Sequence, residues 1–273
     1  MKISGSHIIL TGAASGIGLA LLRELAGYPA HIIAVDLNAE RLARAIDGIP
    51  DPQAAITAFV CDVSSAENID RLFEHALNTL GGVDLFIANA GFAYYEKIAR
   101  ADWTHIEQVY RANVFAPIYS ALKMKDLSGA RPYTVVITAS AMGLLALPGY
   151  ALYSSTKAAL DRFAEGYRFE LDDPRHLMLV YPIGTRTRFF ETAAKNAPLT
   201  WPIQTPEHVA RAIVKGIERD RQAVYPSQLF RLFLWLDRLL PFMRRIEQRI
   251  ERRRFEKWQA ASQQDERGVI RKT

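Results

Sequence analysis

The sequence is poor in cysteine and has no long apolar run, and each absence excludes a class of protein. Cys61 is the single cysteine among 273 residues, so no disulfide can form within the chain, which fits a cytoplasmic setting. No stretch of about 20 uninterrupted apolar residues exists, so we expect no membrane-spanning helix. The longest apolar stretch, 229–243, contains three charged residues and Pro241. We also expect no bound metal.

The positive charge of the chain is concentrated near its C-terminal end. The formal net charge is +5, but residues 219–257 hold eleven Lys or Arg against five Asp or Glu. This local excess of six leaves a net charge of −1 for the rest of the chain, so the main body has no basic character. The basic residues follow one helical segment without a nucleic-acid-reading motif, so we expect no nucleic-acid partner.

Short β-branched runs alternate along the chain with segments of helical periodicity, which is the pattern of a parallel sheet wrapped by helices. The expected strands are His7–Leu10, Ala30–Val35, Ala55–Cys61, Val83–Ala88, Tyr133–Thr138, Leu177–Tyr181 and a weaker Gln222–Tyr225. The expected helices cover residues 17–27, 38–47, 66–80, 103–126, 152–172 and 206–219. Right-handed crossovers then predict an α/β, doubly wound parallel sheet, Rossmann-like and of about seven strands, with ligands at the carboxyl ends of the strands.

This pattern divides the chain into three parts. Residues 1–226 form the expected Rossmann-fold domain, residues 227–262 an amphipathic basic helical extension, and residues 263–273 a polar tail.

A glycine-rich segment joins the first expected strand to the first expected helix. It reads Thr11-Gly-Ala-Ala-Ser-Gly-Ile-Gly18, and its glycines let backbone N–H groups approach a pyrophosphate at the helix N-terminus. The cofactor-binding residues expected here are Gly12, Ser15, Gly16, Ile17 and Gly18. The alternative is a tight strand-to-helix turn without a ligand.

Asp36 ends the second expected strand, 18 positions after Gly18. A carboxylate there can accept hydrogen bonds from the adenosine ribose hydroxyls, and it repels a 2′-phosphate. Its neighbours Ser15 and Leu37 offer no cation, so we expect NAD(H) to be favoured over NADP(H). The alternative role for Asp36 is to cap the helix that begins near Asn38.

Tyr153 and Lys157 lie four positions apart in an expected helix, which places both side chains on one face. An ammonium that close favours the phenolate, so we expect a lowered Tyr153 pKa and a role as acid and base. The chain has eleven tyrosines, so such a pair also arises by chance, and a surface helix pair is the alternative.

Together these elements resemble the short-chain dehydrogenase/reductase family, in its shorter, non-extended subgroup, over about residues 6–226. The matching elements occur in the family's order: Thr11-Gly-x-x-x-Gly-x-Gly18, Asp36, Asp62-Val63, Asn89-Ala90-Gly91, Asn113, Ser140 and Tyr153-x-x-x-Lys157. The resemblance implies an oxidoreductase that moves a hydride between a nicotinamide cofactor and a hydroxyl or carbonyl carbon. An NADP(H)-dependent carbonyl or 3-oxoacyl reductase of the same family is the first alternative.

The resemblance assigns catalytic roles to four residues. Tyr153 would be the acid and base at the substrate oxygen, and Lys157 would lower its pKa and hold the nicotinamide ribose. Ser140 would hydrogen-bond the substrate oxygen, and Asn113 would hold a water that links Lys157 to solvent.

The resemblance also implies further cofactor contacts. Asp62 with Val63 would bind the adenine ring, Asn89 would support the central sheet, and Ala90-Gly91 would border the cofactor. The contacts expected after the sixth strand are Pro182, Thr185 and Thr187.

The chain departs from the family pattern just after the sixth expected strand. Members usually have Pro-Gly there, whereas Pro182 is followed by Ile183, with Gly184 one place later. A β-branched residue does not readily adopt a positive φ, so we expect the loop to take a different path. That path weakens the assignment of Thr185 and Thr187 as carboxamide ligands.

Three rival classes can be tested against the sequence. A hydrolase would use Ser140 as nucleophile, but Thr138–Met142 lacks a glycine-flanked nucleophile elbow and no His is placed as base. A non-catalytic nucleotide-sensing protein would be expected to lose Tyr153, Lys157 or Ser140, and all three are present. Epimerase or dehydratase chemistry on nucleotide sugars would need a longer C-terminal substrate domain.

The expected substrate-facing segments are apolar or aromatic. They follow the fourth, fifth and sixth strands and are Phe92–Tyr95, Met142–Leu147 and Phe189–Trp201. They favour a hydrophobic small-molecule substrate, with ordinary core packing as the alternative.

The extension carries apolar residues at helical spacing from Leu229 to Ile250 and arginines on the opposite face, and Pro241 should divide it into two helices. A basic amphipathic helix suits an anionic membrane surface, and residues 229–258 are the candidate for peripheral contact. The alternative is packing on the domain or on a second subunit, and we expect a homo-oligomer.

Overall fold

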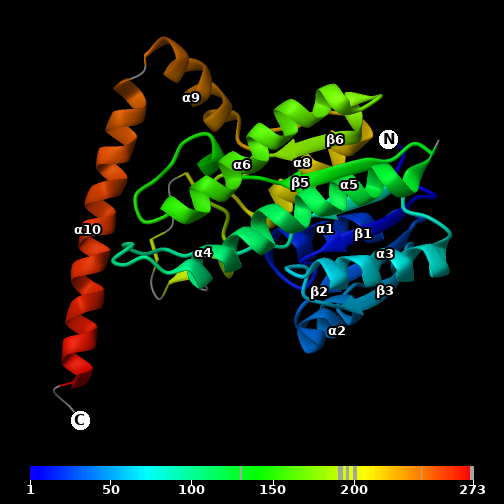
Figure 1. Cartoon of the computed structure of the whole chain (residues 1–273), viewed down its shortest axis with the longest axis horizontal. Helices are drawn as coiled ribbons and strands as arrows, with labels where there is room; N and C mark the ends of the chain where they lie inside the picture. The colour runs from blue at the N-terminus through cyan, green and yellow to red at the C-terminus, as the bar shows by residue number, and fades with distance from the viewer. Residues whose placement is uncertain (130, 190–192, 195–196, 199–201, 241, 271–273) are drawn as a thin grey trace.

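The computed structural model describes residues 1–129, 131–189, 193–194, 197–198, 202–240 and 242–270. Its centre is one seven-stranded sheet with the strand order β3-β2-β1-β4-β5-β6-β7 (Figure 1). The strands are β1 (His7–Thr11), β2 (His31–Asp36), β3 (Ala55–Val60), β4 (Leu85–Ala88), β5 (Thr134–Thr138), β6 (Leu177–Val180) and β7 (Ala223–Val224). This order confirms the doubly wound, Rossmann-like α/β fold and places the reversal of strand order between β1 and β4.

All neighbouring strands pair in parallel, so the carboxyl ends of the strands meet at one edge of the sheet. The central strand β1 pairs with β2 from His7–His31 to Thr11–Val35. Strands β4 and β6 are fully buried along their length. Continuous apolar strands of this kind form when helices cover both faces of a sheet.

Helices cover each face of the sheet with its own hydrophobic core. One core packs α1 (Gly16–Ala26), α2 (Ala39–Asp47) and α8 (Pro206–Glu218) against the strands. The other core packs α3 (Ala66–Leu80), α5 (Ala116–Ser128) and α6 (Ala151–Tyr167) on the opposite face. Short 3-10 turns lie at η2 (Ala141–Gly143), η3 (Arg168–Glu170) and η4 (Pro174–His176).

One expected helix differs from a single regular helix. Residues 103–126 fall into α4 (Trp103–Tyr110), a π-helical turn η1 (Arg111–Phe115) and then α5. A π turn adds one residue to the helix, and such turns occur frequently at functional sites. Asn113 lies within this turn and is fully buried.

The extension forms two helices, α9 (Gln228–Leu239) and α10 (Phe242–Ile270), as the proline predicted; Pro241 itself lies outside the described residues. The helix α10 continues through residues 263–270, which the sequence assigned to the polar tail. It stands beside the sheet body as a long column (Figure 1), and its Phe255 and Trp258 rings pack on Tyr95. No helix of the described residues has the length and hydropathy needed to cross a membrane.

Candidate active site

A cavity of about 1170 Å³ opens at the carboxyl ends of the strands. The sequence-predicted residues that line it are Gly12, Ser15, Gly16, Ile17, Asp36, Asp62, Val63, Asn89, Ala90, Gly91, Ser140, Tyr153, Lys157, Pro182, Thr185 and Thr187. Gly18 and Asn113 do not line this cavity. They contact residues that do: Gly18 lies against Gly12 and Asn89, and Asn113 is hydrogen-bonded to Phe92. Residues far apart in the sequence thus meet at the edge where a doubly wound sheet places its ligands.

The glycine-rich turn brings the N-terminus of α1 to the cavity. Gly12 and Gly16 have positive φ values of 68° and 54°, a region that favours glycine. At Gly18 an added Cβ would lie 1.9 Å from the Gly12 carbonyl oxygen, so only glycine lets α1 pack this close to β1. Ser15 and Ile17 line the cavity beside the first N–H groups of α1, and that helix end suits a pyrophosphate.

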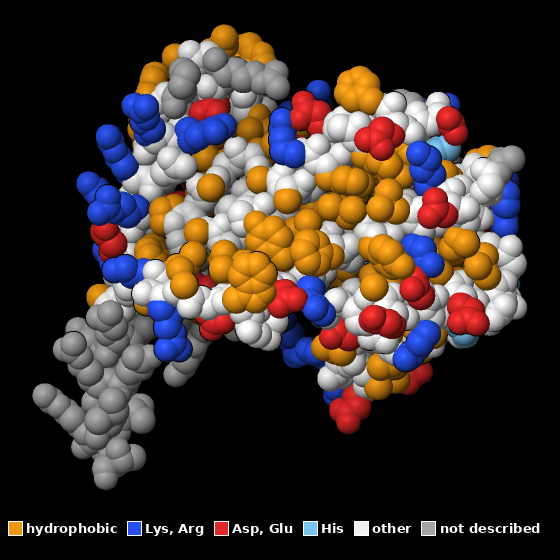
Figure 2. Space-filling view, viewed as in Figure 1, with side chains coloured by type: hydrophobic (Ala, Val, Ile, Leu, Met, Phe, Trp, Pro, Cys, Tyr) orange, Lys and Arg blue, Asp and Glu red, His pale blue; other side chains and the backbone are white. Residues whose placement is uncertain are grey.

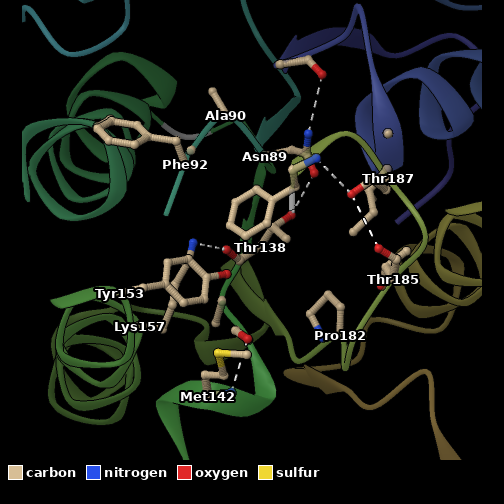
Figure 3. Close-up of a pocket in the computed structure, with 18 of the residues that line it drawn as sticks. Asn89, Ala90, Phe92, Thr138, Met142, Tyr153, Lys157, Pro182, Thr185 and Thr187 are labelled. Carbon is tan, nitrogen blue, oxygen red and sulfur yellow. Dashed lines mark hydrogen bonds between the residues drawn. The ribbon is translucent and has the colours of Figure 1, made fainter. Parts of the chain in front are cut away.

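Asn89 ties together the ends of three strands (Figure 3). Its Nδ2 donates to the Thr11 carbonyl at 3.2 Å, and its Oδ1 accepts from the Thr138 hydroxyl at 3.3 Å. Its backbone N–H donates to the Thr11 hydroxyl at 3.0 Å. These bonds join the ends of β1, β4 and β5.

Tyr153 projects from α6 into the cavity (Figure 3), where it is almost fully buried. Loss of water raises the pKa of the Tyr153 phenol to about 12, and a side-chain hydrogen bond with Ser140 opposes that rise. Ser140 also accepts the Met142 N–H at 3.1 Å, which fixes its hydroxyl at the start of η2. At neutral pH the phenol therefore carries its proton.

Lys157 lies one turn further along α6, and its Nζ is 5.6 Å from the centre of the Tyr153 ring. The amine donates to the Thr138 carbonyl at 2.7 Å, and burial lowers the Lys157 pKa to about 7. The Tyr153 pKa thus lies above its ordinary value and not below it as the spacing indicated, because the loss of water outweighs any effect of Lys157, whose own charge is disfavoured by the same burial. The spacing of four correctly placed the two side chains together, but it carried no information on their burial.

Asn113 supports this wall from the π turn. Its Oδ1 accepts the Phe92 N–H at 3.0 Å, and its Nδ2 donates to the Phe92 carbonyl at 2.8 Å and to the Thr156 hydroxyl at 3.2 Å. A Cβ at Gly91 would lie 2.7 Å from Asn113 Oδ1 and 3.9 Å from Lys157 Nζ. Glycine at this position therefore lets the strand end pass between the amide and the amine.

The loop after β6 follows a path that does not need the family glycine. Ile183 is not among the described residues with positive φ. The Gln204 N–H donates to the Gly184 carbonyl at 2.9 Å, and the Gln204 side chain donates to the Thr185 hydroxyl at 3.2 Å. Thr187 reaches the glycine-rich turn, since its methyl lies 3.1 Å from where a Gly16 Cβ would be. Both threonines line the cavity despite the changed sequence.

The cavity lining contains a cation, Arg41, that the sequence did not predict. The Asp36 carboxylate accepts the Ala14 and Asn38 N–H groups, both at 3.1 Å. Asn38, rather than Asp36, caps α2 through its bond from the Arg41 N–H. Arg41 lines the same cavity, and its buried Nε has no hydrogen-bond partner. The sequence signal for Arg41 was its place in the first turn of α2, the helix that follows Asp36.

Many of the side chains that line the cavity are apolar. They include Phe92, Met142, Leu145, Leu147, Phe189, Pro202, Leu229, Phe230 and Phe233, and the charged residues Arg188 and Glu247 also line it. Three come from α9 and Glu247 from α10, so the extension forms part of the wall. Of the predicted substrate segment 189–201, residues 190–192, 195–196 and 199–201 lie outside the described part of the chain. In that described part, no group of three or more His, Cys, Asp or Glu could hold a metal ion.

Comparison with known proteins places this geometry in a family. The short chain dehydrogenase family model matches residues 6–197. A 3-dehydrosphinganine reductase from Danio rerio is 26% identical over 229 residues, which cover 79% of this chain and 69% of that protein. A short-chain dehydrogenase from Burkholderia phymatum in complex with NAD has a TM-score of 0.77 at 21% identity, over 88% of this chain and 96% of the other.

A second solved structure, from Sphingobium yanoikuyae in complex with NADPH, has a TM-score of 0.74 at 21% identity, over 87% and 95% of the two chains. The solved relatives thus show the same fold with either nicotinamide cofactor. The match over residues 6–197 spans most of the Rossmann-fold domain. This chain belongs to the short-chain dehydrogenase/reductase family of nicotinamide-dependent oxidoreductases.

Proposed function

We propose that this protein transfers a hydride between NAD(H) and the hydroxyl or carbonyl carbon of a hydrophobic substrate, with Tyr153 as the acid and base. The observation that carries the proposal is the shared cavity wall of Tyr153, Ser140 and Lys157, which is joined to the glycine-rich turn of α1 in one cavity. The bound nicotinamide supplies or accepts the hydride, and the protein's own residues handle the proton.

Tyr153 and Ser140 act together at the substrate oxygen. The protonated phenol can donate to a carbonyl oxygen during reduction, while the Ser140 hydroxyl holds that oxygen in place. In the oxidative direction the phenol must first lose its proton, which the buried wall disfavours. Lys157 lies near enough to assist through its charge, and it needs a proton to do so.

The residues on the nucleotide side fit a dinucleotide. Ser15, Gly16 and Ile17 would hold the pyrophosphate at the α1 N-terminus. Thr187, which reaches this turn, and Thr185 would contact the nicotinamide end. Asp62 and Val63 would border the adenine ring, and Ala90 and Gly91 would border the cofactor. Asn89 and Pro182 line the same cavity.

The preference for NAD(H) rests on Asp36. Each of its oxygens accepts one backbone N–H and keeps a lone pair for a ribose hydroxyl, and its charge repels a 2′-phosphate. The second candidate function, NADP(H) use, is favoured by Arg41, because the unpartnered Nε shows a guanidinium that could pair with a phosphate.

Fluorescence titration with NADH and NADPH distinguishes the two cofactors. We expect NADH to bind at least about tenfold more tightly, since a difference of about 1.4 kcal/mol suffices. Asp36→Ala should reduce the ratio of NADH affinity to NADPH affinity. Arg41→Ala should increase that ratio, because it should weaken the binding of NADPH alone. Equal affinities in the unmutated protein would reject the preference for NAD(H).

The apolar side chains of the cavity lining support a hydrophobic substrate. A panel of hydrophobic alcohols and ketones, read by NADH absorbance, should contain at least one compound that the protein turns over faster than short polar analogues. On that substrate Tyr153→Phe should lower turnover about 10²-fold or more while NADH affinity changes little. Near-normal turnover of Tyr153→Phe would show that another group moves the proton.

A further inference from the structure

Large apolar side chains cover the outward-facing side of α9 and the start of α10. Each of the eight is between 41% and 63% exposed, and they are Leu229, Leu232, Trp235, Leu239, Leu240, Phe242, Ile246 and Ile250. In Figure 2 hydrophobic side chains gather over α9 at the top of the view. A group of large apolar side chains this exposed on a folded protein indicates an interaction site.

The inward-facing sides of the same helices are already occupied. Phe230 of α9 is buried and Phe233 lines the cavity. In α10, Phe255 and Trp258 pack on Tyr95, and Gln248 donates to the Ala146 carbonyl at 3.1 Å. Packing on the domain, which the sequence left as an alternative, therefore accounts for one side of the extension and leaves the other side open.

Cations without ion-pair partners share the outward side. The exposed residues for which the described chain offers no carboxylate partner are Arg231, Arg245, Arg249, Arg253 and Lys257. Figure 2 shows Lys and Arg side chains along the free edge of α10. On α10, Arg249 and Arg253 each follow an isoleucine by three positions, so cations and apolar groups lie on one face there and not on opposite faces as the sequence pattern indicated.

The acidic residues of the extension are turned away from this face or are neutralised. Asp237 is buried and accepts from Arg244 at 2.8 Å, and Glu251 is buried and paired with Arg254. Glu247 lines the cavity. The remaining acid, Glu256, pairs with Arg252 at 2.8 Å. The outward side therefore presents positive charge and apolar surface together.

We propose that this outward side of residues 229–257 docks on an anionic membrane surface, with the apolar groups in the headgroup boundary and the arginines at the lipid phosphates. A helix with an apolar stripe and a basic margin binds such surfaces. A second copy of the chain fits less well, because a two-fold contact would set the basic face against itself.

The docked orientation also brings the bilayer to the cavity. Leu229 lines the cavity and is 63% exposed on the same outward side. A hydrophobic substrate could then pass from the lipid to Tyr153 along α9 without crossing bulk water. This delivery step rests on the proposed function, whereas docking can be measured without any turnover.

Vesicle co-sedimentation tests docking with the full-length protein. The probes are vesicles of phosphatidylcholine alone and of phosphatidylcholine with phosphatidylglycerol. The test variant is Arg245→Glu/Arg249→Glu/Arg253→Glu. The matched control reverses three exposed cations at the end of α8, Lys215→Glu/Arg219→Glu/Arg221→Glu. Deletion of α9 and α10 is unsuitable, because it removes part of the cavity wall.

We expect the unmutated protein and the α8 control to sediment with anionic vesicles and much less with neutral ones, with loss in high salt. The α10 variant should bind roughly a hundredfold more weakly, at about 1 kcal/mol for each arginine. Trp235 fluorescence should shift to the blue on binding, and Trp235→Phe should remove that shift. Circular dichroism and NADH binding establish that each variant is folded.

Two results would overturn the proposal. Equal vesicle binding by the α10 variant and the α8 control would show that the outward side is not the contact. A dimer in sedimentation equilibrium that the α10 variant dissociates would show that a second copy covers this side. Docking without activity on any hydrophobic alcohol or ketone would instead count against the proposed function alone.

Discussion

Replacing Lys157 by methionine removes a buried amine and should change how stability depends on pH. Burial lowers the pKa of Lys157 from 10.5 to about 7, so between these values the unfolded chain binds a proton that the folded chain does not. Stability therefore rises with pH across this window, because the unfolded state holds more protons. Methionine has no proton to bind, and its variant lacks this contribution.

The magnitude follows from the shift. Between pH 7 and pH 9 the difference is close to one proton over most of the interval, and one proton corresponds to about 1.4 kcal/mol per pH unit. The unmutated protein should gain about 2 kcal/mol relative to Lys157→Met over these two units. At pH 7 Lys157→Met should be the more stable of the two proteins. It has no amine that is charged in the unfolded chain and must lose water, and in part its proton, when the chain folds.

Urea denaturation of the cofactor-free protein at pH 7, 8 and 9 measures this difference, and the slope m should be the same for both proteins. Lys215→Met, on the exposed side of α8, is the matched control and should follow the unmutated protein. Parallel stability curves for the unmutated protein and Lys157→Met would refute the reasoning, because Lys157 would then titrate alike in both states.

Two further substitutions test the packing of the site. Gly18→Ala should destabilise the protein by about 1–3 kcal/mol and weaken dinucleotide binding, since the new Cβ meets the Gly12 carbonyl. Gly166→Ala, with nothing within 4 Å, should instead stabilise α6 by up to about 1 kcal/mol, and thermal melts that rank the two variants alike would count against this reading. Phe233→Ala should raise kcat/KM for longer hydrophobic substrates relative to shorter ones, whereas an unchanged ratio would place the substrate away from α9.

Local patterns in the sequence predicted the sheet and most of the cavity wall. Apolar runs and helical periodicity identified the seven strands and the main helices, because both patterns reflect which faces are buried. The glycine-rich turn, Asp36 and the pair on α6 were also found, since each has a fixed spacing within one element or one strand-to-helix connection. These are features that a short window of sequence contains.

Features that depend on contacts between distant segments could not be predicted. The sign of the Tyr153 pKa shift depends on burial beneath the loops after β4, β5 and β6, which no spacing within α6 records. Arg41 comes to line the same cavity as Asp36 only once α2 is placed relative to β2. The wall formed by Phe230 and Phe233 requires α9 to fold back toward Met142–Leu147, more than 80 positions away, and the helical pattern of α9 offered packing on the domain only as an alternative.

The π turn η1 makes the length of this region as important as its composition. An α-helix advances about 100° per residue, so removal of one residue from Arg111–Phe115 would restore regular helical phase and rotate all of α4 by that angle about its axis. Thr104, Glu107 and Gln108 would then leave the cavity wall. A redesign that regularises this helix to gain helical propensity would therefore exchange one face of the cavity for another, although no cavity residue had been substituted.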